Sequence, residues 1–314
     1  MQPSRLSVAV ALGIVYVVWG STYLAIRHAV ETLPPFSMAA VRFLVAGGLL
    51  YAWARLRGAP PPRPAHWKTA ALVGSLLLLG GNGAVVWAEQ YVPSSLAALL
   101  VTTTSLWMVL LDWGARGNRP STGVLVGVVA GLVGVGYLLA PGEIEGGTTF
   151  VPGLVLLGGA LSWAVGSVLG RDREKPDSPL LGAGMEMLAG GVGLLLLAIL
   201  VGEPQRFDPA GASAASFAAL GYLVVAGSLV GFTAYSWLLR HAPISVVSTY
   251  AYVNPVVAVW LGWALAGEAL SARTAAASAI IIGSVALITT LQAPRRARAP
   301  APLEEESVSR GAQG

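Results

Sequence analysis

Residues 87–121 read WAEQYVPSSLAALLVTTTSLWMVLLDWGARGNRPS, and residues 237–271 read WLLRHAPISVVSTYAYVNPVVAVWLGWALAGEALS. An offset of 150 residues places identical residues opposite each other at several positions of the two stretches. The matches are Trp87 with Trp237, Pro93 with Pro243, Ser95 with Ser245, Trp113 with Trp263, and Ser121 with Ser271. Tryptophan and proline are rare residue types, so this agreement in one frame indicates an internal repeat.

Upstream of these stretches the repeat continues with an offset of 144. It matches Trp19 with Trp163, Pro35 with Pro179, and the oppositely charged Arg42 and Glu186. Each half contains five apolar stretches, and an odd number of membrane spans forces two halves to insert with opposite orientation. The sequence therefore predicts two inverted repeats, residues 6–140 and 151–292, related by a pseudo-two-fold axis in the membrane plane.

The composition predicts an all-α membrane protein. Charged residues form only 11% of the chain, hydrophobic residues form 55%, and the mean hydropathy is +0.70. A soluble domain carries roughly one quarter charged residues, so this chain has too little polar surface to cover a core of this size. Ten transmembrane helices are expected near residues 6–28, 36–55, 68–89, 94–114, 121–140, 151–170, 180–201, 214–239, 244–266 and 273–292.

The positive charges predict the orientation of these spans. With a cytoplasmic N-terminus, 15 Lys and Arg residues fall on the cytoplasmic side, and only Arg206 and Arg273 fall on the other side. Cytoplasmic loops of membrane proteins carry such an excess. Both termini are therefore expected in the cytoplasm of a bacterial cell whose inner membrane holds the protein. The tail 293–314, which mixes Pro, Arg and Glu, is expected to be disordered.

Several partners and cofactors are not expected. The chain has no cysteine and no His-based metal or phosphate-loop pattern, so we expect no metal, no cofactor and no enzymatic activity. The basic residues lie in short loops, which topology explains better than a nucleic-acid partner. Gly123, Gly127 and Gly131 form a small-residue face that favours helix packing within one bundle over a homodimer interface.

Polar side chains inside lipid are costly, so the few in these spans are candidates for function. They include Arg42, Asn82, Glu186 and Asn254. In one interpretation Arg42 and Glu186 serve structure, either as an ion pair or as separate anchoring charges. In the other, Arg42 is an anion anchor and Glu186 is a proton-binding carboxylate. The structural interpretation is favoured. Glu89 and Glu268 lie at span ends, and Glu268 is expected to be a solvated helix cap.

Pro255 follows Asn254 in the middle of the ninth span and is the expected hinge. A proline there releases a backbone carbonyl about one turn earlier, near Ala251, so the break presents a polar backbone to a substrate or serves as a packing kink. The equivalent part of the fourth span carries Thr104 and Ser105 instead.

Tryptophans and tyrosines suggest an aromatic binding site. Trp19 and Trp163 are related by the repeat and lie about 13 residues into their spans, too deep for an interfacial aromatic belt. We expect both to line a central cavity and to stack against a flat or apolar substrate. Trp107, Tyr235 and Tyr250 lie on neighbouring segments and are further candidates.

The chain resembles the drug/metabolite transporter superfamily, in its ten-span EamA-type branch. The resemblance covers residues 6–292. It rests on Trp19-Gly20-Ser21, Pro35 to Phe43, Tyr91 to Leu100, His241-Ala242-Pro243, Tyr252 to Ala258, and Gly267-Glu268. The sequence departs from the family pattern at Ser105, where the fourth span usually has a proline, and at Asn118, where an acidic residue is common.

The resemblance implies a basket of ten helices around a central cavity that works by alternating access. By position within the spans, it places Trp19, Asn82, Trp107, Trp163, Tyr235 and Asn254 around the substrate. The expected function is export of small metabolites, amino acids or drugs, driven by protons or by the substrate gradient. The alternatives are an exchanger for sugar or phosphate esters, and a membrane scaffold without transport.

Overall fold

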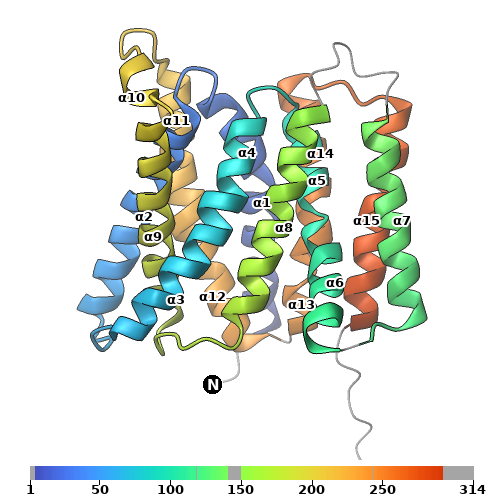
Figure 1. The fold of residues 1–314 in the computed structure, drawn as a ribbon, viewed down its shortest axis with the longest axis horizontal. Helices are drawn as coiled ribbons and strands as arrows, with labels where there is room; N and C mark the ends of the chain where they lie inside the picture. The colour runs from blue at the N-terminus through green and yellow to red at the C-terminus, as the bar shows by residue number, and fades with distance from the viewer. Residues whose placement is uncertain (1–3, 118, 141–149, 243, 293–314) are drawn as a thin grey trace, which may run out of the picture.

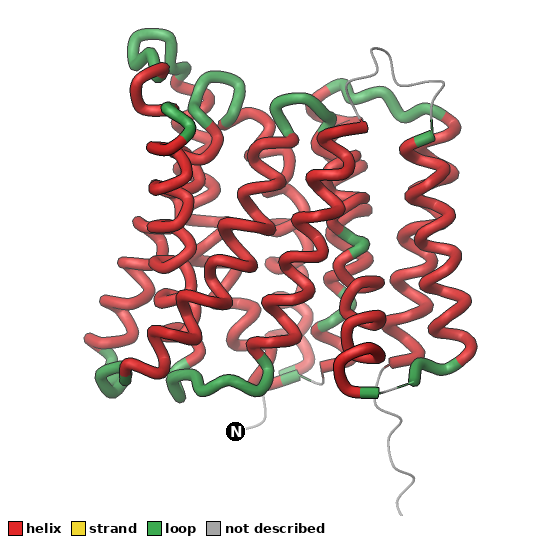
Figure 2. Tube along the Cα trace, viewed as in Figure 1, coloured by secondary structure: helices red, strands yellow, loops and turns green. Residues whose placement is uncertain are grey.

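The computed structural model describes residues 4–117, 119–140, 150–242 and 244–292. They form one bundle of helices joined by short loops (Figures 1 and 2), and the described residues include no strand. The expected all-helical fold is confirmed. The tail 293–314 and residue Asn118 lie outside the described residues.

The helices of the first half begin with α1 (Arg5–Ala29) and α2 (Pro35–Leu56). The third span consists of α3 (Pro64–Gly74), the π-helical segment η1 (Ser75–Asn82) and α4 (Gly83–Ala88). The fourth span consists of α5 (Ser94–Val101) and α6 (Thr104–Arg116), and α7 (Thr122–Leu139) completes the half.

The second half has the same order of long and divided spans. It contains α8 (Phe150–Gly170), α9 (Pro179–Leu200) and the short α10 (Glu203–Arg206). The eighth span consists of α11 (Ala214–Tyr222), the π-helical segment η2 (Leu223–Val230) and α12 (Gly231–His241). Two further spans follow, one formed by α13 (Ile244–Val247) with α14 (Tyr250–Ala266) and one by α15 (Ala272–Gln292).

Nine helical stretches of the described residues are long and apolar enough to cross a membrane. The remaining expected span is the ninth in chain order. Its main helix, α14, is apolar but shorter than the other nine stretches. The span is divided at Ser248 and Thr249, which form a turn, and the Thr249 hydroxyl donates a hydrogen bond of 2.6 Å to the carbonyl of Val246. The interruption therefore lies before Pro255, which is inside α14.

Successive spans cross the bundle in alternating directions (Figure 1). We call the end at which α1 begins the lower end; the loop between α2 and α3 also lies there. The upper end is the opposite one and holds α10 and the turn between α4 and α5 (Figure 1).

Four glycines with positive φ end helices at corresponding places. At the lower end they are Gly58 (φ 87°) after α2 and Gly117 (φ 71°) after α6. At the upper end they are Gly202 (φ 74°) after α9 and Gly267 (φ 65°) after α14. Glycine adopts this left-handed conformation without steric cost, which fixes where each helix stops.

Small residues bring the long helices together. A Cβ at Gly127 would lie 2.8 Å from Cγ1 of Ile288, and a Cβ at Gly131 would lie 2.7 Å from Oγ of Ser284, so α7 packs directly on α15. Gly47 and Gly184 serve α2 and α9 in the same way. The glycine face expected from the sequence thus packs inside the bundle.

Candidate functional site

A cluster of four aromatic rings joins α1, α12 and α14. Trp19 lies at its centre, with ring centroids 5.4 Å from Phe232, 5.1 Å from Tyr235 and 5.4 Å from Tyr250. Tyr235 and Tyr250 are 5.7 Å apart and edge to face. Trp19 and the two tyrosines are half-buried, so part of the surface of each residue remains exposed. The sequence-predicted residues Trp19, Tyr235 and Tyr250 are therefore brought together.

The backbone of η2 positions the ring of Trp19. Its Nε1 donates a hydrogen bond of 3.1 Å to the carbonyl of Gly227. A Cβ at Gly231 would lie 2.4 Å from the same nitrogen, so only glycine permits this approach. A π-helical segment disturbs the regular helical hydrogen bonds, and such segments occur frequently at functional sites.

Trp163 of α8 lies in a corresponding place on the other π-helical segment. A Cβ at Gly81 of η1 would lie 2.9 Å from its ring. Unlike Trp19, however, Trp163 makes no close ring contact with another aromatic residue of the described chain. The two repeat-related tryptophans therefore both pack on a π-helical segment of the other half, but the aromatic cluster forms only around Trp19.

Arg42 is buried in α2, with 5% of its surface exposed. Its Nε donates a hydrogen bond of 3.1 Å to Oγ of Ser228 in η2, and its guanidinium lies 4.8 Å from the ring centre of Phe43. Its Nη1 has no hydrogen-bond partner in the described protein. Gly227, which accepts the Trp19 hydrogen bond, directly precedes Ser228, so Arg42 and Trp19 contact adjacent residues of η2.

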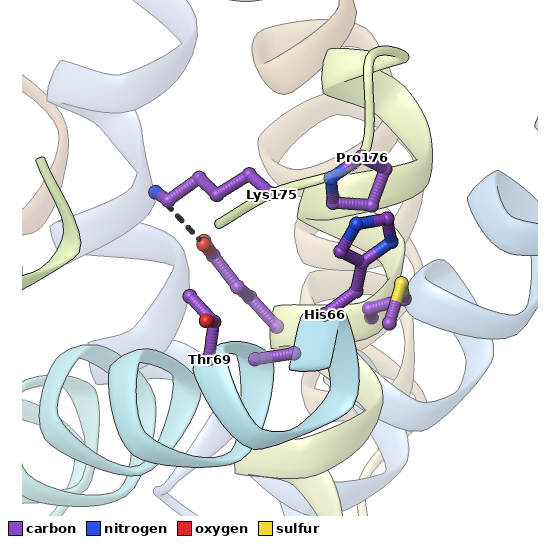
Figure 3. Close-up of a pocket in the computed structure, with 8 residues that line it drawn as sticks. His66, Thr69, Lys175 and Pro176 are labelled. Atoms are coloured by element: carbon purple, nitrogen blue, oxygen red, sulfur yellow. Dashed lines mark ion pairs between the residues drawn. The ribbon is translucent and has the colours of Figure 1, made fainter. Parts of the chain in front are cut away.

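Glu186 lies elsewhere, near the lower end of α9. Its carboxylate pairs with Lys175 at 3.2 Å, beside a small pocket that His66 and Thr69 also line (Figure 3). Arg42 and Glu186 do not pair with each other. Each is the eighth residue of its helix, and α2 starts at the upper end whereas α9 starts at the lower end. With a rise of about 1.5 Å per residue in helices of this length, they lie at different depths.

Three further predicted residues carry buried polar atoms without a partner in the described protein. These atoms are Oδ1 of Asn82, Nε1 of Trp107 and Oδ1 of Asn254. Asn254 lies beside α1, since a Cβ at Gly20 would be 3.0 Å from its carbonyl oxygen. Buried polar atoms are usually hydrogen-bonded, so these unpaired atoms are available to a polar ligand.

Sequence reasoning missed Glu203, and it named Glu89 and Glu268 only as residues at span ends; all three carboxylates lie at the upper end. Glu89 is completely buried, and neither of its carboxylate oxygens has a partner in the described protein. Glu203 accepts hydrogen bonds from Phe36 and Ser37 at the start of α2.

The sequence suggested that Glu268 is a solvated helix cap, but its side chain is half-buried. It accepts hydrogen bonds from the backbone and hydroxyl groups of Ser94 and Ser95, at the start of α5. A glutamate directly follows a glycine at both 203 and 268, and this recurrence is the sequence feature that could have indicated that the two glutamates have similar roles.

Comparisons with known proteins agree with this architecture. The model of the EamA-like transporter family matches residues 7–140 and 152–290, so it occurs twice along the chain. An inner membrane transporter of Escherichia coli K12, YedA, named as uncharacterized, is 42% identical over 284 residues, which cover 89% of each protein. A transporter of Archaeoglobus fulgidus, also named as uncharacterized, is 28% identical and covers 90% of this chain and 96% of its own.

A solved crystal structure shares the fold. It superposes with a TM-score of 0.60, covers 93% of this chain and all of its own, and is 24% identical in sequence. The family matches and the apolar helices together identify a multi-pass protein of the inner membrane. The chain belongs to the EamA-like transporter family.

Proposed function

We propose that this transporter exports small amphipathic metabolites, amino acids or drugs by alternating access. The observation that carries the proposal is the aromatic cluster around Trp19, half-buried and next to the polar groups of η2. Aromatic faces bind flat or apolar groups and also attract cations. A substrate with an apolar body and a polar end fits such a site.

The unpaired polar atoms support the same substrate chemistry. The Nη1 of Arg42 is a free donor, whereas the Oδ1 atoms of Asn82 and Asn254 are free acceptors. A small molecule with both a donor and an acceptor satisfies groups that are costly to leave buried and unpaired. Trp19 lies in an aromatic cluster, whereas Trp163 has no such neighbours in the described chain, so the substrate is expected to lie closer to Trp19.

Alternating access requires parts that can change shape. The fourth and ninth spans are interrupted at 102–103 and 248–249, and the third and eighth spans each contain a π-helical segment. These irregular places support a rocking motion of two inverted five-helix repeats about a central axis. The excess of Lys and Arg at the lower end supports a cytoplasmic location for that end and for both termini.

The exchanger alternative is less favoured because a phosphate-ester site needs surplus positive charge. Arg27 and Arg42 are the cations that act on the buried carboxylate of Glu89, and the carboxylate of Glu268 acts on the same group. Two positive and two negative charges leave no net charge for a multiply charged anion.

Counterflow of labelled amino acids and drugs in proteoliposomes tests the proposed function. We expect saturable flux in the wild type, a loss of most flux in Trp19→Ala, and a smaller loss in Trp163→Ala. Trp260→Ala is the matched control, because Trp260 is in α14 but 58% exposed on the bundle surface.

Equal losses in Trp19→Ala and Trp260→Ala would contradict a site at the aromatic cluster. If a wide panel gave no wild-type flux under any condition, the scaffold alternative would gain support instead.

A further inference from the structure

Glu89 is a buried carboxylate that the proposed substrate site does not use. It follows α4 at the upper end and has 0% of its surface exposed. Its backbone carbonyl accepts a hydrogen bond of 2.6 Å from Nη1 of Arg27, but its two carboxylate oxygens have no partner in the described protein. Few carboxylates are buried without hydrogen bonds, because the ionised form is then poorly solvated.

The charged and titratable groups that face Glu89 come from three elements. Arg27 and Tyr23 belong to α1, Arg42 belongs to α2, and Glu268 lies in the loop between α14 and α15. With every Arg and Glu ionised, the two positive charges balance the two negative ones.

Hydrogen bonds hold only part of this group in place. The carboxylate of Glu268 accepts hydrogen bonds from four donors of Ser94 and Ser95. Glu89 and Arg42 keep free polar atoms, and they form no ion pair within 4.0 Å in the described chain. Glu89 is therefore the carboxylate of this group whose charge no hydrogen bond holds in place.

Both charge states of Glu89 have a cost. The ionised form lacks hydrogen-bond donors in a buried site, whereas the protonated form leaves Arg42 without its compensating charge. A group with two states of this kind can bind and release a proton when its surroundings change.

Glu89 is also connected to the parts that are expected to move. It lies five residues before Ser94, where the carboxylate of Glu268 joins the two halves. On the other side, Arg42 contacts Ser228 of η2, and the neighbouring Gly227 accepts the hydrogen bond from Trp19. A change of charge at Glu89 thus acts both on the upper end and on the backbone that carries the aromatic cluster.

We propose that Glu89 is the proton-binding site that couples this transporter to the proton gradient. One proton from the solution binds to a carboxylate oxygen of Glu89 when the upper end opens, and closure of that end buries it. The coupling rests on the proposed transport function, whereas binding of the proton is a property of the protein alone.

Infrared difference spectroscopy between acidic and alkaline pH tests the proton site without any substrate. In the full-length protein in liposomes, we expect a carbonyl band of a protonated buried carboxyl group that Glu89→Gln removes. Glu203→Gln is the matched control and keeps the band. Glu89→Asp retains a carboxyl group, so we expect the band at a changed frequency. That result would show that Glu89→Gln loses the band because it lacks the carboxyl group and not because it misfolds.

A band that persists in Glu89→Gln, or that Glu203→Gln removes, would overturn the proposal, and so would its absence from the wild type. Flux then tests the coupling. Glu89→Gln should keep counterflow at equal pH and lose the acceleration by an imposed pH gradient. Wild-type flux that ignores the gradient would overturn the coupling, whereas absence of flux with an intact infrared band would count against the transport function and not against the proton site.

Discussion

The two ends of the bundle are built alike but are held together differently. At each end, two helices stop at a left-handed glycine, yet the next residue is Glu203 or Glu268 at the upper end and Ala59 or Asn118 at the lower end. The two glutamates reach across to the first half and accept hydrogen bonds at the starts of α2 and α5. We call these two contacts the upper latches.

The lower end relies on a local helix cap and on exposed ion pairs. The start of α9 is capped by its own Ser178, and the ion pairs there join Arg63 to Glu174 and Lys175 to Glu186. Exposed ion pairs contribute little because water and salt screen them. Carboxylates that accept several hydrogen bonds at a helix start contribute more, so opening the upper end is expected to cost more than opening the lower end.

The largest effect is expected for Glu268→Ala. The substitution removes four hydrogen bonds at the start of α5 and leaves backbone N–H groups of a partly buried helix end unpaired. We expect a loss of about 3 kcal/mol in the stability of the closed upper end. The chain has no cysteine, so labelling of Val92→Cys, at a buried upper-end position, reports opening without background.

In that assay, Val92→Cys is expected to be protected in the wild-type background and labelled rapidly with Glu268→Ala. Equal labelling in both backgrounds would show that Glu268 does not hold the upper end closed.

The next largest effect is expected for Glu203→Ala. Its carboxylate accepts three hydrogen bonds rather than four, and it caps the whole helix α2. We expect about 2 kcal/mol of destabilisation, measured as a lower melting temperature in detergent and as faster labelling of Val92→Cys. An effect larger than that of Glu268→Ala would reverse the proposed order of the two latches.

A smaller effect of opposite sign is expected for Ala59→Glu. Ala59 packs against a cluster that includes Leu181 near the start of α9, so we expect a carboxylate there to cap that helix as Glu203 caps α2. We expect a gain of about 1 kcal/mol for the closed lower end and slower transport. Ala59→Gln is the control without charge, and equal slowing in both variants would argue against a carboxylate latch.

The smallest effect is expected for Glu186→Gln. This substitution removes the ion pair with Lys175, which is 43% exposed. The stability should change by less than about 1 kcal/mol, and the response of transport to a pH gradient should be unchanged. A lost pH response would make Glu186 the coupling carboxylate and would contradict the role proposed for Glu89.

Local sequence patterns were sufficient for most of the fold. Apolar stretches predicted the helices. The depth of Trp19 and Trp163 in their spans predicted that both line a central cavity and stack against a substrate, and this stays a prediction. The π-helical segments left no such signal, because Ser75 to Asn82 and Leu223 to Val230 have the composition of ordinary apolar helices. Pro255 was the obvious hinge, yet the Thr249 hydroxyl bonds the backbone of the preceding turn and the span is interrupted there.

The polar contacts were harder to predict because they join residues far apart in the chain. The partners of Glu203 and Glu268 lie more than 160 residues away, so a glutamate after a glycine looked like a local cap. Arg42 and Glu186 occupy equivalent positions, but equivalent positions of helices that run in opposite directions lie at different depths. Glu89 is buried by residues far from it in the chain, Arg27 of α1 among them, and one sequence does not reveal such packing.

Pulsed electron spin resonance on the cysteine-free chain tests the difference between the two ends most directly. Spin-label pairs at exposed positions 91 and 270 report the upper end, and pairs at 56 and 173 report the lower end. We expect one narrow distance distribution at the upper end, a broader one at the lower end, and a second, longer upper-end distance that appears in Glu268→Ala. Equally broad distributions at both ends, or an upper-end distance unchanged by Glu268→Ala, would contradict the account.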